Sequence, residues 1–225
     1  MINFGKVTPE EAIEYFVKKL LLSSEEFAAL EQDAKTMAFT VSELSKQTEL
    51  EFVFDSIKKA LEEGQGFSEW KKQTKELWKQ KGWSDFRIKT VYQTNMHQAK
   101  SVGTWKQIQE TKEDFPYLRY SAILDSHTRP SHASMHGKVL PVNDKFWDSF
   151  YPPNGFNCRC QAYAITEIKA KKFGVTPDVA KVGFADEGWN YNAGKAYDKK
   201  INGLLDEQSS KTEKSKNEVR SLLKK

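Results

Sequence analysis

The chain has 225 residues, of which 38% are hydrophobic and 12% aromatic. This length suggests one or two domains, and the aromatic content excludes a chain that is disordered throughout. No run approaches the roughly 18 consecutive apolar residues of a membrane helix, and the first residues lack the apolar core of a signal peptide. The sequence therefore predicts a soluble protein, made in the cytoplasm, without a membrane partner.

The net charge of +4 is concentrated at the end of the chain, although basic and acidic side chains are nearly balanced overall, at 35 and 31. Residues 195–225 hold nine basic and five acidic side chains, so the first 194 residues, with 26 of each, are neutral. A neutral body gives no compositional reason to expect nucleic-acid binding. The polar basic tail, residues 199–225, is the one segment from which we expect a weak contact with DNA.

The first half of the chain has the apolar spacing of helices. A helix is predicted after Thr8 and Pro9, and the pair Ser23 and Glu26 predicts a second, whose apolar spacing continues to Leu44. Further helices are predicted over residues 50–61, 67–79 and 84–102, separated by glycines.

The second half has a different pattern. Residues 118–124 and 158–165 are predicted to be strands, and the segment between them is irregular and rich in Pro, Gly, Asn and His. The fold class is therefore α+β, a mainly helical N-terminal half followed by a small domain with a short antiparallel sheet and a long irregular motif loop. We place the boundaries at 1–110 for the helical region, 111–198 for the α+β domain and 199–225 for the tail.

Four metal-ligand side chains surround the irregular loop. His132 and His136 share a helix face if Pro130 occupies the first turn of a short helix, and Cys158 and Cys160 share a face if they lie on a strand. Two imidazoles and two thiolates suit tetrahedral zinc, and four protein ligands make a closed, structural site. We predict such a zinc ion as the only cofactor.

A plainer interpretation of the same residues stays open. In it, the two thiols are buried against Trp147 and the histidines bond loop carbonyls. A disulfide between Cys158 and Cys160 is not expected, since it would close a very small, strained ring. Arg129 and Arg159 are expected to be structural cations, with Asp125 or loop carbonyls as partners of Arg159.

No catalytic residue is predicted. The two histidines lack the Glu that zinc peptidases carry after the first His, because residue 133 is Ala. The weaker alternative is a metal-dependent hydrolase site, whose four candidate residues are Asp125, His127, His132 and Asp144.

The motif loop resembles the phage Mu protein F-like family of head morphogenesis proteins, and the resemblance covers residues 50–197. The residues that carry it, in order, are Asp125, Thr128-Arg129-Pro130, His132, His136-Gly137, Asp144, Phe146-Trp147, Pro152-Pro153-Asn154-Gly155 and Cys158-Arg159-Cys160. All four predicted metal ligands fall inside this motif, although the resemblance by itself implies no metal role. It implies motif or structural roles for Asp125, Thr128, Arg129, Trp147, Pro153, Gly155 and Arg159.

The resemblance implies a minor head protein of a tailed phage or prophage. Such a protein would contact the portal and other procapsid proteins, through the helical region here, and assist DNA delivery. It would be found in the host cytoplasm during assembly and then in the virion head, and would have no small-molecule substrate. Two alternatives remain: a metal-dependent nuclease or hydrolase acting on phage DNA, and a non-specific DNA-binding head protein that uses the tail.

Overall fold

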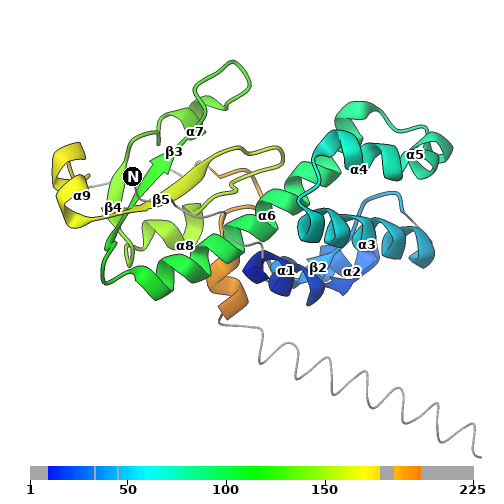
Figure 1. Cartoon of the computed structure of the whole chain (residues 1–225), viewed down its shortest axis with the longest axis horizontal. Helices are drawn as coiled ribbons and strands as arrows, with labels where there is room; N and C mark the ends of the chain where they lie inside the picture. The colour runs from blue at the N-terminus through cyan, green and yellow to red at the C-terminus, as the bar shows by residue number, and fades with distance from the viewer. Residues whose placement is uncertain (1–9, 33, 45, 178–184, 199–225) are drawn as a thin grey trace, which may run out of the picture.

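The computed structural model describes residues 10–32, 34–44, 46–177 and 185–198. The predicted cap at Thr8 and the predicted tail of residues 199–225 lie outside these ranges. The fold is α+β, with helices in the first half and a three-stranded antiparallel sheet in the second, as the sequence predicts (Figure 1). No described helix has both the length and the apolar character needed to span a membrane.

The N-terminal half consists of helices and one pair of very short strands. Its elements are α1 (Glu10–Val17), β1 (Leu20–Leu21), α2 (Ser24–Ala29), the 3-10 helix η1 (Ala34–Met37), β2 (Ala38–Phe39), α3 (Gln47–Glu63), α4 (Phe67–Gln73), α5 (Lys75–Lys81) and α6 (Asp85–Thr111). Ser23 and Glu26 form the predicted capping box of α2. Ser84 caps α6, and Gly64 ends α3 in the left-handed conformation. These sequence signals therefore set the helix ends where they were expected.

Two helix predictions in this half are wrong. The helix expected to continue to Leu44 ends at Ala29, and β2 follows, paired in parallel with β1. Phe39 of β2 is buried against the rings of Phe16 and Phe54. The apolar residues between the end of α2 and Leu44 are therefore spaced as in a helix, although they lie in a turn and a short strand. Apolar spacing alone does not distinguish these cases over a short segment.

The helix predicted over residues 67–79 is interrupted at Thr74, where α4 ends and α5 begins. The Thr74 hydroxyl donates to the Trp70 carbonyl at 2.8 Å and accepts from the Trp78 indole at 2.6 Å. These bonds bury a polar side chain between two tryptophans and fix the break.

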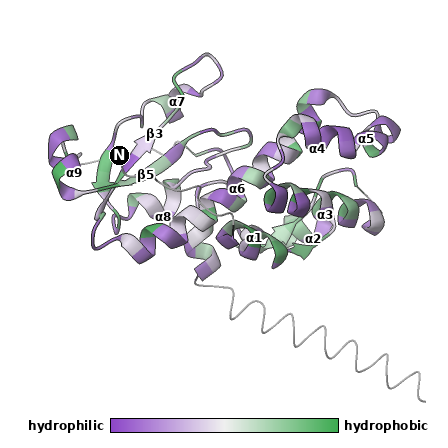
Figure 2. Cartoon of the chain, viewed as in Figure 1, coloured by the Kyte–Doolittle hydropathy of each residue, from purple (hydrophilic) through white to green (hydrophobic). Residues whose placement is uncertain are grey.

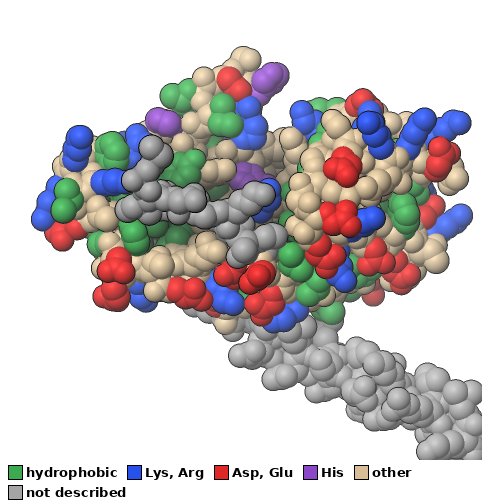
Figure 3. All heavy atoms as spheres, viewed as in Figure 1, with side chains coloured by type: hydrophobic (Ala, Val, Ile, Leu, Met, Phe, Trp, Pro, Cys, Tyr) green, Lys and Arg blue, Asp and Glu red, His purple; other side chains and the backbone are tan. Residues whose placement is uncertain are grey.

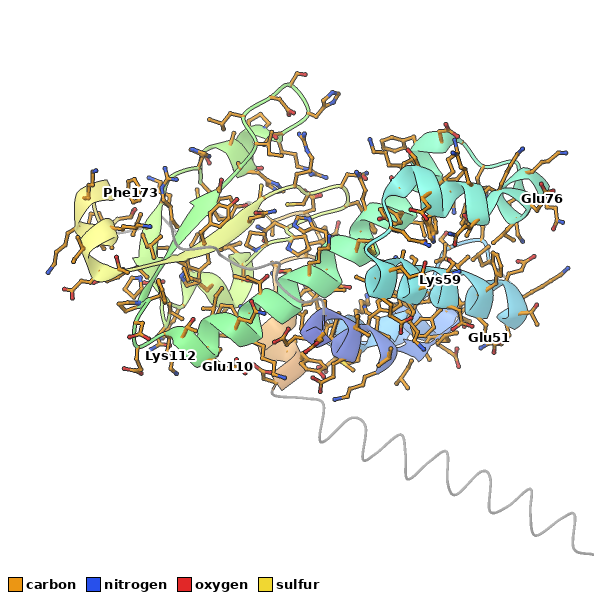
Figure 4. All side chains as sticks on the ribbon, in the orientation of Figure 1. Glu51, Lys59, Glu76, Glu110, Lys112 and Phe173 are labelled. Atoms are coloured by element: carbon orange, nitrogen blue, oxygen red, sulfur yellow. The ribbon has the colours of Figure 1, made fainter. Side chains whose placement is uncertain are left out.

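The first core lies where α1 packs between α3 and α6. Its largest fully buried side chains are Tyr15, Phe16, Phe39 and Trp70. The outer turns of α3, α4 and α5 are mostly hydrophilic (Figure 2). Figure 4 shows Glu51 of α3 and Glu76 of α5 extending away from this core. The helical half is therefore an amphipathic packing of helices around one aromatic cluster.

The second half is built around a sheet of order β4-β3-β5. Its elements are β3 (Tyr117–Ser121), α7 (Pro130–Ala133), β4 (Val139–Pro141), α8 (Phe146–Phe150), β5 (Gln161–Ile165) and α9 (Glu167–Phe173), and a helical turn over 193–198 closes the described chain. Both strand pairs of this sheet are antiparallel. Leu118 and Tyr120 of β3 face a second core that includes Trp105 and Ile108 of α6 and Trp147 of α8. Helix α6 therefore contributes to both cores.

The strand predictions were right about position but too long. The predicted strand over 118–124 ends at Ser121, and the one over 158–165 begins at Gln161. Cys158 and Cys160 thus precede β5 instead of lying on it. The chain there is held by contacts to other elements, described below, which replace the sheet pairing that the alternating sequence suggested.

Candidate metal centre

His132, Cys158 and Cys160 form a buried cluster in the second core. The His132 Nδ1 atom lies 3.7 Å from the sulfur of Cys158 and 3.8 Å from that of Cys160. All three ligand atoms lie within 4.8 Å of one another, and no side chain of the three is more than 5% exposed. Within the part of the chain that the structure describes, no other three His, Cys, Asp or Glu side chains come together in this way.

Helix α7 positions His132. Pro130 occupies its first turn, as the sequence predicts, and the helix ends after one turn, at Ala133. His132 is buried on the inner side of that turn. The short helix fits the sequence, because Pro is favoured at the first helical position and Gly137 follows closely.

His136 does not join the cluster. It lies beyond the end of α7, so the helix face that it was expected to share with His132 does not exist. The Nδ1 atom of His136 lies 3.2 Å from the amide nitrogen of Ala122 and 3.0 Å from its carbonyl oxygen. Of the four predicted ligands, the structure therefore brings three together, and it places the fourth against the backbone that follows β3.

Both cysteines lie in the segment before β5, and contacts to α6 hold this segment in place. The Asn157 side chain donates to the Thr90 hydroxyl at 3.0 Å, and Asn157 itself has a positive φ of 54°. The carbonyl of Cys158 lies 2.5 Å from Nδ1 of His97. Asn tolerates the left-handed region better than most residues, which explains the sharp bend that turns both thiols toward α7.

Two cavities flank this segment. One of about 410 Å³ is lined by Cys160 and by α1, α6 and β5, and one of about 290 Å³ is lined by Cys158 and Arg159. His97 and Lys100 of α6 line both cavities. The cluster itself is buried, yet small molecules can approach the cysteine-bearing segment from two sides.

The surroundings favour a thiolate at one of the two cysteines. A hydrogen bond from Cys160 lowers the pKa of Cys158 below its usual range, aided by His132 and by the backbone N–H groups of Asn154 and Cys160, against the opposing effect of burial. The bond to Cys158, together with burial, raises the pKa of Cys160 well above its usual range. Two thiols this close cannot both ionise without a compensating cation.

A buried tyrosine and asparagine extend the network. The Asn154 side-chain amide donates to the Tyr120 hydroxyl at 3.0 Å and to the Phe150 carbonyl at 3.1 Å. The Tyr120 hydroxyl is hydrogen-bonded to Cys160, and burial raises its pKa far above the usual range. Tyr120 therefore stays protonated and can donate to sulfur.

Two arginines hold the loops around the cluster. Arg159 pairs with both carboxylate oxygens of Asp125, at 2.6 and 2.7 Å, and donates to Thr128 at 3.1 Å. The Arg159 guanidinium holds the pKa of Asp125 well below its usual range. Of the two kinds of partner expected for Arg159, the structure shows the carboxylate.

Arg129 lies on the other side of the cysteine segment. It donates to the Phe156 carbonyl at 3.0 Å and pairs with Asp186 at 2.7 Å. A Cβ atom at Gly155 would overlap the Asp186 carboxylate and lie 3.3 Å from Arg129. Glycine is thus needed at 155 because an acidic side chain from a distant segment occupies the space beside it.

The remaining motif residues form the floor of the second core. Trp147 is fully buried, and its indole donates to the Pro141 carbonyl at 2.9 Å. Asn192 donates to the Trp147 carbonyl at 2.9 Å. Pro153 is buried and follows a cis peptide bond. These residues pack and tie the chain, and Trp147 belongs to the same buried cluster as Cys158 and Cys160, as the plainer interpretation of the thiols expects.

The residues of the hydrolase alternative are dispersed. Asp125 is paired with Arg159, and His127 is exposed on the same loop. Asp144 accepts from the Phe146 amide at 2.8 Å at the start of α8. Only His132 of that set belongs to the ligand cluster, so the described residues do not assemble the carboxylate site that such an enzyme would need.

The family of the chain follows from sequence comparison. The family model described as phage Mu protein F like protein matches residues 51–163, half of the chain, from α3 to β5. The chain belongs to this phage Mu F-like family. The match spans the motif loop and all three members of the ligand cluster.

Two curated relatives agree with this assignment. The chain is 29% identical over 190 residues to Mu capsid assembly protein F of Escherichia phage Mu, covering 76% of this chain and 43% of that protein. It is 31% identical over 159 residues to the Mu-like prophage FluMu F protein of Haemophilus influenzae, covering 64% and 38%. The chain therefore spans less than half the length of these relatives. No solved structure matches it significantly.

Three residues of this phage Mu F-like chain act in the site without having been predicted to do so. Tyr120 contacts Cys160, and Asn154 donates to the Tyr120 hydroxyl. His97 contacts the Cys158 carbonyl. Tyr120 alternates with the buried Leu118 on β3, which fits its burial, but no sequence pattern indicated its partner. His97 has the spacing of a packed helix residue, so only the tertiary structure shows which carbonyl it meets.

Proposed function

We propose that this chain is a minor head protein that acts in head morphogenesis of a tailed phage or prophage. In this proposal it contacts the portal and other procapsid proteins, remains in the virion head and assists DNA delivery. The observation that carries the proposal is the family match, which runs unbroken from the helical half through the whole motif loop. The relative from phage Mu is itself named a capsid assembly protein.

The surface of the helical half is compatible with a protein partner. Both acidic and basic side chains lie on the face of α3 to α5 seen in Figure 3. Phe86 at the start of α6 is 74% exposed and Phe52 of α3 is 46% exposed. Exposed aromatic side chains are frequent anchors of protein interfaces, and the second half exposes Phe156 and Phe173 as well. We propose Phe86, the most exposed of these aromatic side chains, as part of the portal contact.

Co-expression with the portal and the other head proteins of the same phage tests the proposal. A tagged chain is purified in the absence of DNA, and we expect the portal protein to be recovered with it. Phe86→Ser removes an exposed anchor without disturbing a core, so it should lower portal recovery several-fold. Ile168→Ser, on the 81% exposed Ile168 of α9, is the matched control and should leave recovery unchanged.

The role in assembly has its own test. Deleting the gene from a complete phage or inducible prophage should reduce the yield of DNA-filled heads, and the full-length gene supplied in trans should restore it. Normal yields of infectious particles without the gene, together with no portal recovery from the tagged chain, would overturn the proposed function.

A further inference from the structure

We propose that His132, Cys158 and Cys160 bind one zinc ion, which fastens helix α7 to the segment that precedes β5. One imidazole and two thiolates are ligands that zinc takes in tetrahedral sites. This site has three protein ligands, in place of the four that the sequence spacing predicted. The proposal concerns the fold of the motif loop and is independent of whether the chain contacts a portal.

The positions of the ligand atoms fit such an ion. Bonds of about 2.3 Å to sulfur and about 2.1 Å to nitrogen, at a tetrahedral angle, place sulfur and nitrogen about 3.6 Å apart. The two distances from His132 Nδ1 to sulfur are 3.7 and 3.8 Å. Both nitrogen–sulfur distances therefore match those of a tetrahedral zinc site, and the two sulfurs lie within 4.8 Å of each other.

The chemistry of the cluster favours a cation. Zinc binding requires both thiols to lose their protons to solvent, and the two thiolates then balance the charge of the ion. Burying two negative sulfurs side by side without a cation would be costly. Arg129 and Arg159, on the loops around the cluster, are paired with Asp186 and Asp125, so their charge is already largely neutralised.

Hydrogen-bond donors surround the two sulfurs, as they commonly do around the thiolate ligands of a metal site. Backbone N–H groups of Asn154 and Cys160 donate to the Cys158 sulfur, and the Tyr120 hydroxyl contacts Cys160. Donors of this kind stabilise thiolate ligands and fix their orientation. The oxygen of the Asn154 side chain, which is fully buried, has no hydrogen-bond partner among the described residues, as in a site with an additional polar occupant.

His136 is left out of the proposed ligand set because neither of its ring nitrogens lies within 4.8 Å of all three other ligand atoms. Its Nδ1 atom is held against the Ala122 backbone. A tetrahedral ion on three protein ligands keeps a position for solvent. The cavity that reaches Cys158 and the one that reaches Cys160 bring solvent to the edge of the cysteine segment.

Elemental analysis of the reduced full-length chain, purified from zinc-supplemented cells, tests the proposal. We expect one zinc ion per chain in the wild type and in His136→Gln. His132→Gln and Cys158→Ser each remove a direct ligand, so both should be recovered with most of the zinc lost. His136→Gln is the matched control, because it alters the neighbouring histidine of the same loop. Chelation should lower the Tm of the wild type and of His136→Gln.

Cobalt titration keeps the test decisive if a ligand variant fails to fold. Co²⁺ added to the reduced, metal-free wild type should give a tetrahedral visible spectrum and a sulfur-to-cobalt charge-transfer band of two thiolates. A folded wild type that binds neither zinc nor cobalt would overturn the proposal and leave the cluster as hydrogen-bonded thiols. If His136→Gln loses zinc as completely as His132→Gln, the three-ligand assignment is wrong.

Discussion

Lys19 is a basic side chain placed inside the first core. It is 5% exposed, and its ammonium donates to the Gln98 side chain at 2.9 Å and to the Ala38 carbonyl at 3.3 Å. The Tyr15 ring lies 4.9 Å from it. Among the described residues no carboxylate pairs with this ammonium, and burial lowers its pKa from 10.5 to about 7. A charged Lys19 therefore works against folding.

Replacing Lys19 by Met should stabilise the protein. The contribution of Lys19 to the free energy of unfolding should rise as the pH increases from 7 to about 10, because in this range the unfolded chain still binds the proton that the folded chain has released. Lys19→Met should lack this rise and gain about 1–3 kcal/mol at pH 7, less than the pKa shift alone implies, since it gives up two hydrogen bonds. Urea unfolding at several pH values measures both effects.

Lys18→Met is the matched control, because Lys18 is the neighbouring residue but lies at the surface, paired with Glu14. It should leave the pH dependence of unfolding between pH 7 and 10 as in the wild type. Parallel curves for Lys19→Met and the wild type would show that the buried ammonium is not the source of the pH dependence.

For single residues of the motif loop, the sequence predicted which side chains lie near one another better than it predicted the contacts that each one makes. His132, Cys158 and Cys160 were expected together and lie together. His136 was expected with them and is bound to Ala122 instead. The spacing of two histidines does not indicate where a helix ends. Because α7 ends at Ala133, His136 does not share a helix face with His132.

Helix ends were predictable where a local signal exists and not where burial alone acts. Ser23, Ser84, Gly64 and Pro130 mark ends that the structure shows. Strand β2 and the end of α2 have no such signal, because β2 exists through its pairing with β1 and the packing of Phe39. Pairing between segments about 18 residues apart cannot be derived from either segment alone.

The crossing of α1 and α6 depends on Gly103. A Cβ atom there would lie 3.0 Å from the Ala12 amide nitrogen and 3.3 Å from the Glu11 Cβ. The backbones of the two helices therefore approach more closely than a larger residue permits. Gly103→Leu should destabilise the protein by about 2 kcal/mol or more through overpacking, and Gly103→Ala should cost less, since one methyl group needs only a small shift.

Thermal and urea unfolding of the wild type, Gly103→Ala and Gly103→Leu measure this series. We expect stability to fall as the side chain at position 103 grows, so the wild type is the most stable and Gly103→Leu the least. Alanine favours helix over glycine by roughly 1 kcal/mol, so a Gly103→Ala variant more stable than the wild type by that amount would mean that α1 moves freely and the close crossing has no energetic role.

Over the whole molecule, α6 joins the two halves that the sequence divides near residue 110. Its N-terminal part carries Ile88 and Tyr92 into the first core, and its C-terminal part carries Trp105 and Ile108 into the second. Gly194, near the end of the described chain, packs against Trp105 so closely that a Cβ atom there would overlap the ring. The two cores share one continuous helix, which predicts cooperative unfolding.

We expect one unfolding transition for the full chain. Ile57→Ala in the first core and Leu118→Ala in the second, both at fully buried positions, should each lower that same transition by about 2–5 kcal/mol. Calorimetry and circular dichroism measure it. Two separate transitions, each sensitive to only one of the substitutions, would instead support independent domains with a boundary near residue 110.

The sequence by itself determined the α+β class, most helix starts and the family, because each depends on local spacing or on residue chemistry. It also named the three side chains that cluster, His132, Cys158 and Cys160, although it expected His136 with them. Only the tertiary structure decided that α6 serves both cores, that the cysteines precede β5, and that His136 turns away from them. These features depend on contacts between distant segments, such as His97 with Cys158 and Gly155 with Asp186. Such contacts are set by the packing of the whole chain, which no local pattern encodes.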